Sequence, residues 1–169
     1  TFASNENDAQ ENDLIAQIYR DSLLQCKEVP SNVRAFMSAP TLLFHKKYDN
    51  AIHILDSVYK SYAPYSRDAG IIAYSLASAY QGKNDSKNMI KYFAISAISD
   101  VLNGARENLS LKILAKLIFE SGDIDRAYKY MKNAMEDAIL CNARINTIEA
   151  SDMYLFIDKA FQEKEKNKF

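Results

Sequence analysis

Side chains with the chemistry for catalysis or metal binding are few and scattered along this sequence. The two histidines, His45 and His53, belong to no HExxH motif and to no carboxylate spacing typical of a metal site. Asp123 and Asp125 form a close carboxylate pair, which helix capping and solvation explain. The sequence contains no GxGxxG, P-loop or GxSxG motif. We therefore expect no enzyme, no catalytic residue, no bound metal and no cofactor.

The composition is that of an ordinary globular domain and excludes several other classes. The 169 residues are 48% hydrophobic and 25% charged, and 21 basic against 22 acidic side chains leave a net charge of −1. This balance offers no electrostatic case for direct nucleic-acid binding. No apolar run approaches the roughly 20 residues that span a bilayer. The chain begins at Thr1 rather than Met, so we expect it to be a segment of a longer protein.

The two cysteines have no spacing that indicates a function. Cys26 and Cys141 lie far apart in the chain and form no CxxC or metal-type pair. They allow one disulfide or two packed, unpaired thiols, and we expect the thiols.

The elements that position every candidate residue are helices in a repeat. In "FESGDIDRAYKYMKNAMEDA", residues 119–138, a Gly-Asp pair interrupts two helical patterns. Gly122 suits the left-handed position after a helix, and Asp123 can accept hydrogen bonds from the N-terminus of the next helix. The pattern predicts a helical hairpin, with helices over residues 106–121 and 124–141. Asn84 and Asp85 repeat the same turn one copy earlier.

The copies follow one another at a constant interval, which the positions of Ala39, Ala77 and Ala115 define. Small residues recur where two helices approach closely, and large apolar residues recur where their crossing must be filled. The other repeated registers are Leu42, Tyr80 and Ile118; Ala51, Met89 and Ala127; and Leu55, Phe93 and Met131. An irregular helical bundle with accidental spacing is the alternative.

These spacings resemble the tetratricopeptide repeat (TPR), a helical hairpin that is usually about one helical turn shorter than the copies in this chain. "LASAY", residues 76–80, matches its first half, and "SGDIDRAYKYMKNA", residues 121–134, matches its second half. The usual Trp is absent, and Ala73 and Leu111 stand near its place. The resemblance implies an all-α superhelix of about three hairpins with flanking N-terminal and C-terminal capping helices.

The repeat divides the chain as follows. Residues 1–12 form an acidic, polar segment that we expect to be disordered, and residues 164–169 form a charged tail. One helical domain covers residues 13–163, with units at about 32–69, 70–107 and 108–145 and a capping helix at about 145–163. In the first unit, Pro40 predicts two short helical pieces instead of one helix.

The flanking helices carry apolar stripes of their own. The N-terminal stripe is predicted to belong to the second helix of an earlier repeat, and it comprises Leu14, Ile15, Ile18 and Tyr19. The face of the capping helix comprises Ile145, Ile148, Met153, Phe156, Ile157 and Ala160.

The C-terminal part of the chain, residues 65–165, is similar to a region of a group of bacterial membrane-bound transcriptional regulators. Members have an extracytoplasmic TPR part, one transmembrane helix and a cytoplasmic output region. The segments that carry the resemblance begin with "IIAYSLASAYQGKND" and continue from "YFAISAISDVL" to "NTIEAS". The resemblance implies a periplasmic sensor segment attached to the membrane through a region that follows this chain. A cytoplasmic location stays open.

In the TPR fold the first helix of each hairpin lines a concave groove, and this places candidate binding residues. Aromatic anchors with polar and basic neighbours suit an extended peptide or an acidic tail. The alternative is that the aromatic residues pack between hairpins and the lysines are solvated. The predicted groove residues are Phe36, Tyr74, Ser78, Gln81, Lys112, Lys116 and Phe119, with Leu43 in an equivalent register.

Two functional hypotheses follow from these observations. The first is a non-catalytic module that binds a protein, peptide or ligand in the groove and passes the change along the last helix. The second is a structural oligomerisation or scaffold module without a small ligand, in which exposed apolar faces pair protomers into a homodimer.

Overall fold

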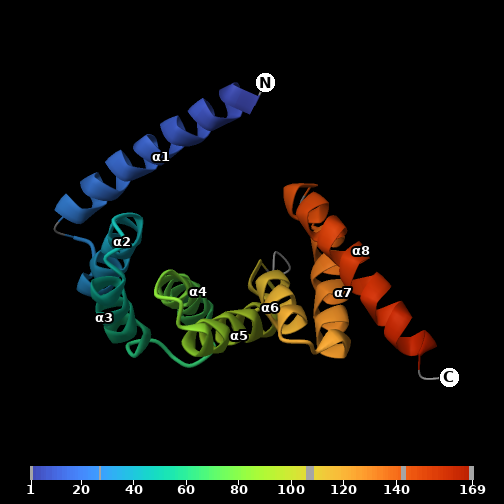
Figure 1. Cartoon of the computed structure of the whole chain (residues 1–169). Helices are drawn as coiled ribbons and strands as arrows, with labels where there is room; N and C mark the ends of the chain where they lie inside the picture. The colour runs from blue at the N-terminus through green and yellow to red at the C-terminus, as the bar shows by residue number, and fades with distance from the viewer. Residues whose placement is uncertain (1, 27, 106–108, 142–143, 168–169) are drawn as a thin grey trace. The chain divides into compact units, whose positions relative to one another are not determined.

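The computed structural model describes residues 2–26, 28–105, 109–141 and 144–167, with side chains for residues 14–141 and 151–167 within these ranges. Every regular element of these residues is an α-helix, so the predicted all-α, TPR-like fold class is confirmed (Figure 1). The helices are α1 (Phe2–Gln25), α2 (Ser31–Phe44), α3 (Tyr48–Tyr59), α4 (Arg67–Gly82), α5 (Ser86–Leu102), α6 (Leu109–Glu120), α7 (Ile124–Leu140) and α8 (Arg144–Lys166).

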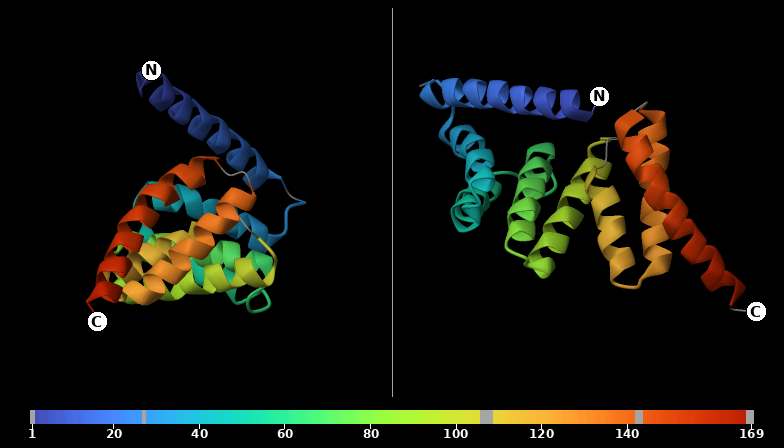
Figure 2. Two further views of the ribbon diagram at one scale, coloured as in Figure 1. Left: turned by 90° about the vertical axis from the view of Figure 1, so that its right-hand side faces the viewer. Right: turned by 45° about the horizontal axis from the view of Figure 1, so that its top comes forward.

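The helices belong to two compact units, Thr1–Ser61 and Tyr62–Phe169. The first unit contains α1 and the hairpin of α2 and α3. The second contains the hairpins α4–α5 and α6–α7 and the final helix α8. Each of these five helices packs against the next along the chain (Figure 2). The predicted domain of residues 13–163 spans both units, and its boundaries stay a prediction.

The turn inside each hairpin has the same backbone conformation, at positions one repeat apart. Gly122 and Asn84 have φ values of +91° and +58°, which confirms the predicted left-handed positions. Lys46, one repeat earlier, has a φ of +56°. Lysine has no preference for a positive φ, so only its position one repeat before Asn84 indicates this conformation.

The residue after each left-handed position begins the second helix. The carboxylates of Asp85 and Asp123 accept hydrogen bonds from the backbone N–H groups of Asn88 (3.1 Å) and Arg126 (3.0 Å). Both predicted N-caps are therefore confirmed. Hydrogen bonds from Asn88 and Arg126 hold the pKa of each carboxyl below its ordinary value of 3.8. Lys47 stands at the same place in the first hairpin and makes no such side-chain cap.

The repeated small and large residues form the interior of the hairpins. Three of the four predicted registers are buried in every copy, and the fourth, which contains Leu42, Tyr80 and Ile118, is partly buried. The three alanines of the first register are completely buried, which fits the close approach of two helices. The nine buried residues are Ala39, Ala77, Ala115, Ala51, Met89, Ala127, Leu55, Phe93 and Met131.

Helices α4 and α5 approach each other especially closely near Gly70. A Cβ atom at Gly70 would lie 2.6 Å from the Cβ of Ser99 on α5, closer than real side chains allow. Glycine at this position therefore lets the end of α5 lie directly against the start of α4.

Helix α8 covers the third hairpin, and it extends a few residues beyond the predicted capping helix of residues 145–163. Ile157 is completely buried in a core shared with Met131 and Ala127, and Phe156 meets Phe119 of α6 edge to face at 5.4 Å. Of the predicted apolar face, Ile145 and Ile148 lie outside the described side chains.

Aromatic and charged contacts also hold α8 against α7. The rings of Tyr128 and Phe161 stack with centroids 4.3 Å apart, and Tyr154 lies beside the same tyrosine at 6.1 Å. A hydrogen bond with Tyr128 raises the pKa of Tyr154 to about 12. Lys164 forms an ion pair with Asp125 at the start of α7, at 2.5 Å. Movement of the third hairpin would therefore carry α8 with it.

Two predictions about α1 and α2 are wrong. Helix α2 passes through Pro40 without a break. Pro40 is exposed while Ala39 beside it is completely buried, so packing against α3 holds the helix together despite the lost hydrogen bond. Helix α1 begins at Phe2, within the segment 1–12 that we expected to be disordered. That segment contains no Gly or Pro to stop a helix from extending towards the N-terminus.

Candidate functional site

A cavity of about 260 Å³ lies within the second unit, among helices α4, α5 and α6. In a TPR hairpin the first helix faces the groove, and both first helices of this unit, α4 and α6, contribute to the lining. The cavity is lined by Ile71, Tyr74 and Ser75 of α4, Ser96 and Asp100 of α5, and Leu109 and Ser110 of α6.

Two serines join α5 to α6 at this cavity. Ser96 and Ser110 are 2% and 1% exposed, and the Ser110 hydroxyl donates a hydrogen bond of 2.8 Å to the Ser96 hydroxyl. Each oxygen retains lone pairs that can accept a further hydrogen bond. The pair therefore holds the two helices in register and presents acceptors at the cavity wall.

Asp100 is the one charged residue in the described lining of this cavity. Its side chain is half-buried, and burial raises the pKa of its carboxyl. Within the described part of the chain, its carboxyl has no hydrogen-bond or ion-pair partner. Partial burial of a carboxylate is costly unless an ion pair or hydrogen bonds compensate for the lost solvation.

Tyr74 is the aromatic residue of the cavity. Its ring meets Phe93 edge to face, with centroids 5.6 Å apart and planes at 71°. Burial raises the pKa of its phenol, so the hydroxyl remains protonated and able to donate at physiological pH. Phe93 is 1% exposed, and this contact restricts the tyrosine ring at the cavity wall.

The polar residues of the cavity depart from the repeat. Ser96 and Asp100 stand one repeat before Ala134 and Ala138, which are both buried. Ser110 stands one repeat after Ile72, which is 3% exposed. The cavity is therefore polar at registers that a neighbouring copy uses for apolar packing.

Of the predicted groove residues, Tyr74 alone lines this cavity. Ser78 lies one turn further along α4 and donates a hydrogen bond to the Tyr74 carbonyl, at 3.1 Å. Gln81 and Lys116 are exposed, and Lys112 is partly buried.

The two predicted phenylalanines have other surroundings. Phe119 is partly buried and packs edge to face against Phe156 of α8. Phe36 is partly buried on α2, in the first unit. The structure therefore brings Tyr74 and Ser78 together and places Phe119 in a packing contact.

The carboxyl and serine residues of the cavity were not predicted from the sequence. The prediction rested on positions that repeat, whereas Ser96, Asp100 and Ser110 are positions where the repeat fails. A comparison of each buried register across the copies would have found them.

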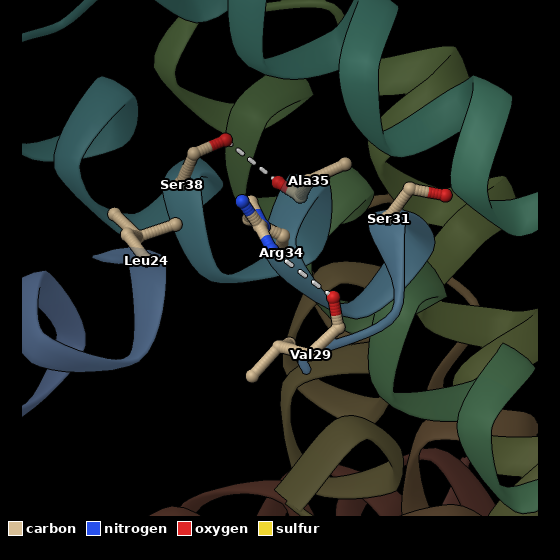
Figure 3. Close-up of a pocket in the computed structure, with 6 residues that line it drawn as sticks. All are labelled: Leu24, Val29, Ser31, Arg34, Ala35 and Ser38. Carbon is tan, nitrogen blue, oxygen red and sulfur yellow. Dashed lines mark hydrogen bonds between the residues drawn. The ribbon is translucent and has the colours of Figure 1, made fainter. Parts of the chain in front are cut away.

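The first unit has a separate cleft of about 630 Å³ beside the end of α1 and the start of α2 (Figure 3). Arg34 donates hydrogen bonds from Nη2 to the carbonyls of Cys26 (2.8 Å) and Val29 (3.3 Å). Its Nε atom is buried and finds no partner among the described residues. The arginine thus fixes the connection between the two helices, which explains its position.

The remaining candidates for chemistry do not assemble. His45 ends α2 and lies edge to face against Phe44, and His53 is exposed on α3. The described residues hold no group of three or more potential metal ligands. Cys26 and Cys141 are both exposed, so the prediction that they are packed is wrong.

Comparison with known families assigns the fold. The family model of the SusR N-terminal TPR domain matches residues 1–152. The chain belongs to this family. The match begins well upstream of residue 65, so it extends the TPR assignment over the first hairpin and α1. No curated protein matches the chain.

Family membership sets the general class of function. TPR domains commonly mediate protein–protein interactions and are generally non-catalytic, which indicates a protein-binding or scaffold module. The resemblance to bacterial transcriptional regulators fits the SusR assignment. None of the described helices combines the length and the hydrophobicity needed to cross a membrane.

Proposed function

We propose that this chain is the sensor segment of a membrane-anchored transcriptional regulator, and that it binds a partner peptide over the cavity among α4, α5 and α6. The observation that carries the proposal is the polar lining of that cavity at registers where a neighbouring copy is apolar and buried. Polar residues at packed registers reduce the stability of the fold, and such departures from a packing pattern are expected at functional sites. Recognition of a partner would be such a function.

The form of the cavity supports a protein or peptide partner. Ile71 and Leu109 are 47% and 36% exposed, and they provide apolar contact area beside the polar wall. Tyr74 adds an aromatic anchor whose ring is held in place by Phe93. Apolar and aromatic anchors beside a few polar groups are characteristic of peptide recognition.

The contacts of α8 give a route for the signal. The cavity wall includes the start of α6, and the end of α6 meets α8 through Phe119 and Phe156. A partner that shifts α6 would change the packing of α8, and α8 is the last described helix of the chain. The regulator's output region would respond to that change.

The extracytoplasmic location rests on the resemblance of residues 65–165 to membrane-bound regulators. It predicts that the whole regulator is found in the membrane fraction, with this segment digested by protease added to spheroplasts. Digestion only after the inner membrane is broken would place the segment in the cytoplasm and contradict this part of the proposal.

Peptide selection tests the binding site. A random peptide library displayed on phage is selected against the whole chain, and the affinities of the recovered peptides are measured for wild type and for Tyr74→Ala. We expect a loss of at least about tenfold in Kd, corresponding to about 1.4 kcal/mol. Tyr19→Ala is the matched control, because Tyr19 is 69% exposed on α1. Peptides that bind Tyr74→Ala as tightly as wild type would refute the assigned site.

Oligomerisation is a second candidate function, favoured by the apolar stripe of α1. Of this stripe, which we predicted to belong to the second helix of an earlier repeat, Leu14, Ile18 and Tyr19 are 60%, 57% and 69% exposed. Sedimentation of wild type and Ile18→Lys separates the candidates. A dimer that survives dilution and is lost in Ile18→Lys would support this function; a monomer at all concentrations would reject it.

A further inference from the structure

We propose that the cavity among α4, α5 and α6 receives a basic side chain, lysine or arginine, of the partner, whose charge pairs with Asp100. This inference rests on the proposed function, because it specifies what the same site recognises. It differs from the expectation from the sequence, in which Lys112 and Lys116 lie in the groove and the ligand is an extended peptide or an acidic tail.

The charge of the cavity favours a basic ligand. Among the described lining residues Asp100 is the one that carries a charge, and its carboxyl has no partner in the described part of the chain. A partner cation would pair with this carboxyl in partly desolvated surroundings, where an ion pair is stronger than at an open surface. Lys112 and Lys116 do not line the cavity, so they do not reverse its charge.

The volume of the cavity favours a single side chain. Cavities that hold drug-sized ligands have volumes of about 300–1,000 Å³. A volume of about 260 Å³ lies below that range and suits one long side chain. The apolar part of the lining, Ile71 and Leu109, would contact the methylene stem while the charged head reaches the polar wall.

The serine hydroxyl groups of the cavity favour a ligand that donates hydrogen bonds. Ser110 donates its proton to Ser96, and Ser75 donates to the Ile71 carbonyl at 3.3 Å. Because their protons are engaged within the protein, these hydroxyl oxygens present lone pairs to a ligand, and lone pairs accept the N–H groups of a guanidinium or ammonium. The ring of Tyr74 offers a further contact for a cation.

The repeat register shows that this arrangement is specific to one hairpin. The residue equivalent to Asp100 in the third hairpin is Ala138, which is 6% exposed. That hairpin therefore has no carboxylate at this place and provides no second site of the same kind.

The binding of a model compound tests the inference directly. N-acetyl-arginine amide is titrated into the whole chain, labelled at its isoleucine and leucine methyl groups, and the NMR shifts of Ile71 and Leu109 are followed. We expect saturable shifts with a Kd in the millimolar range, as befits a single side chain. N-acetyl-norleucine amide, which has an apolar stem and no charge, should bind at least about tenfold more weakly.

Three variants separate a charge effect from a folding effect. Asp100→Asn keeps the shape and should weaken arginine amide binding at least about tenfold. Asp100→Ala copies the third hairpin, so it should fold and also lose binding. Asp56→Asn removes the same charge from α3 in the first unit and should change nothing. Equal binding of the two amides, no saturable shift, or wild-type binding by Asp100→Asn would each overturn the inference.

The selected peptides distinguish this inference from the proposed function. Peptides that depend on Tyr74, contain a basic residue and lose affinity in Asp100→Asn would support both. Peptides that depend on Tyr74 but bind Asp100→Asn normally would leave the proposed function standing and refute the basic side chain. Peptides that do not depend on Tyr74 would refute the proposed site itself.

Discussion

The last turns of α5 and α7 occupy the same register of the repeat but have different surroundings. On α5, Ser96 and Asp100 line an open polar cavity; on α7, Ala134 and Ala138 are buried. The third hairpin is covered by α8, whose aromatic rings pack against α6 and α7. One backbone arrangement therefore supports either close packing or an open polar cavity, and the side chains at two or three registers decide which.

The largest expected effect of a substitution is in the packed core between the third hairpin and α8. Met131 is completely buried between α7 and α8, and Met131→Ala would remove that contact and leave a cavity. We expect a loss of about 2–5 kcal/mol in the free energy of unfolding, measured by urea denaturation. A loss below about 1 kcal/mol would show that α8 packs only loosely on this hairpin.

The serine pair of the cavity should have an intermediate and non-additive effect. Ser96→Ala would leave the buried Ser110 hydroxyl without its acceptor, at a cost of about 1–3 kcal/mol. Replacing both serines by alanine removes donor and acceptor together and should be nearly neutral. A double-mutant cycle by urea denaturation measures the difference. Additive losses would mean that the hydrogen bond does not stabilise the fold.

Much of the packing within the hairpins could be predicted from the sequence, whereas less of the cavity among α4, α5 and α6 could. The repeat register located the buried alanines, the left-handed turns at Asn84 and Gly122, and the caps at Asp85 and Asp123. These features depend on local rules of helix ends and close packing, which short sequence patterns record. The turn at Lys46 was missed because lysine has no preference for that conformation.

The cavity was harder to predict because it depends on which surfaces remain uncovered. Tyr74 and Phe119 have the same aromatic character in first helices of the repeat. Only the structure shows that Phe119 contacts Phe156 of α8 while Tyr74 borders a cavity. The continuous helix through Pro40 has the same kind of cause, since tertiary packing against α3 outweighs a local preference.

The smallest expected effects are pH-dependent and have opposite signs at the two kinds of aspartate. Burial raises the pKa of Asp100, so its ionisation opposes folding; Asp100→Ala should be more stable than wild type at pH 7, and the difference should shrink as the pH falls through the folded-state pKa. Helix capping lowers the pKa of Asp123, so its contribution is present above its ordinary pKa of 3.8 and is lost as the pH falls through the folded-state value.

Urea denaturation of both variants between pH 7 and pH 3 checks these signs. Asp123→Ala should be less stable than wild type at pH 7, with a difference that shrinks on acidification. If Asp100→Ala were also less stable at pH 7, the carboxylate would have a stabilising partner, and the contrast between the two aspartates would be lost.

The most direct test of the central claim is a map of where a bound peptide contacts the chain. A selected peptide is added to methyl-labelled protein, and the shifts of all isoleucine and leucine methyl groups are compared. We predict that the largest shifts occur at Ile71 and Leu109, beside Tyr74 and Asp100, with smaller changes at Ile157 on the buried face of α8. Shifts confined to Leu14, Ile15 and Ile18 of α1, or to Leu155 of α8, would contradict it.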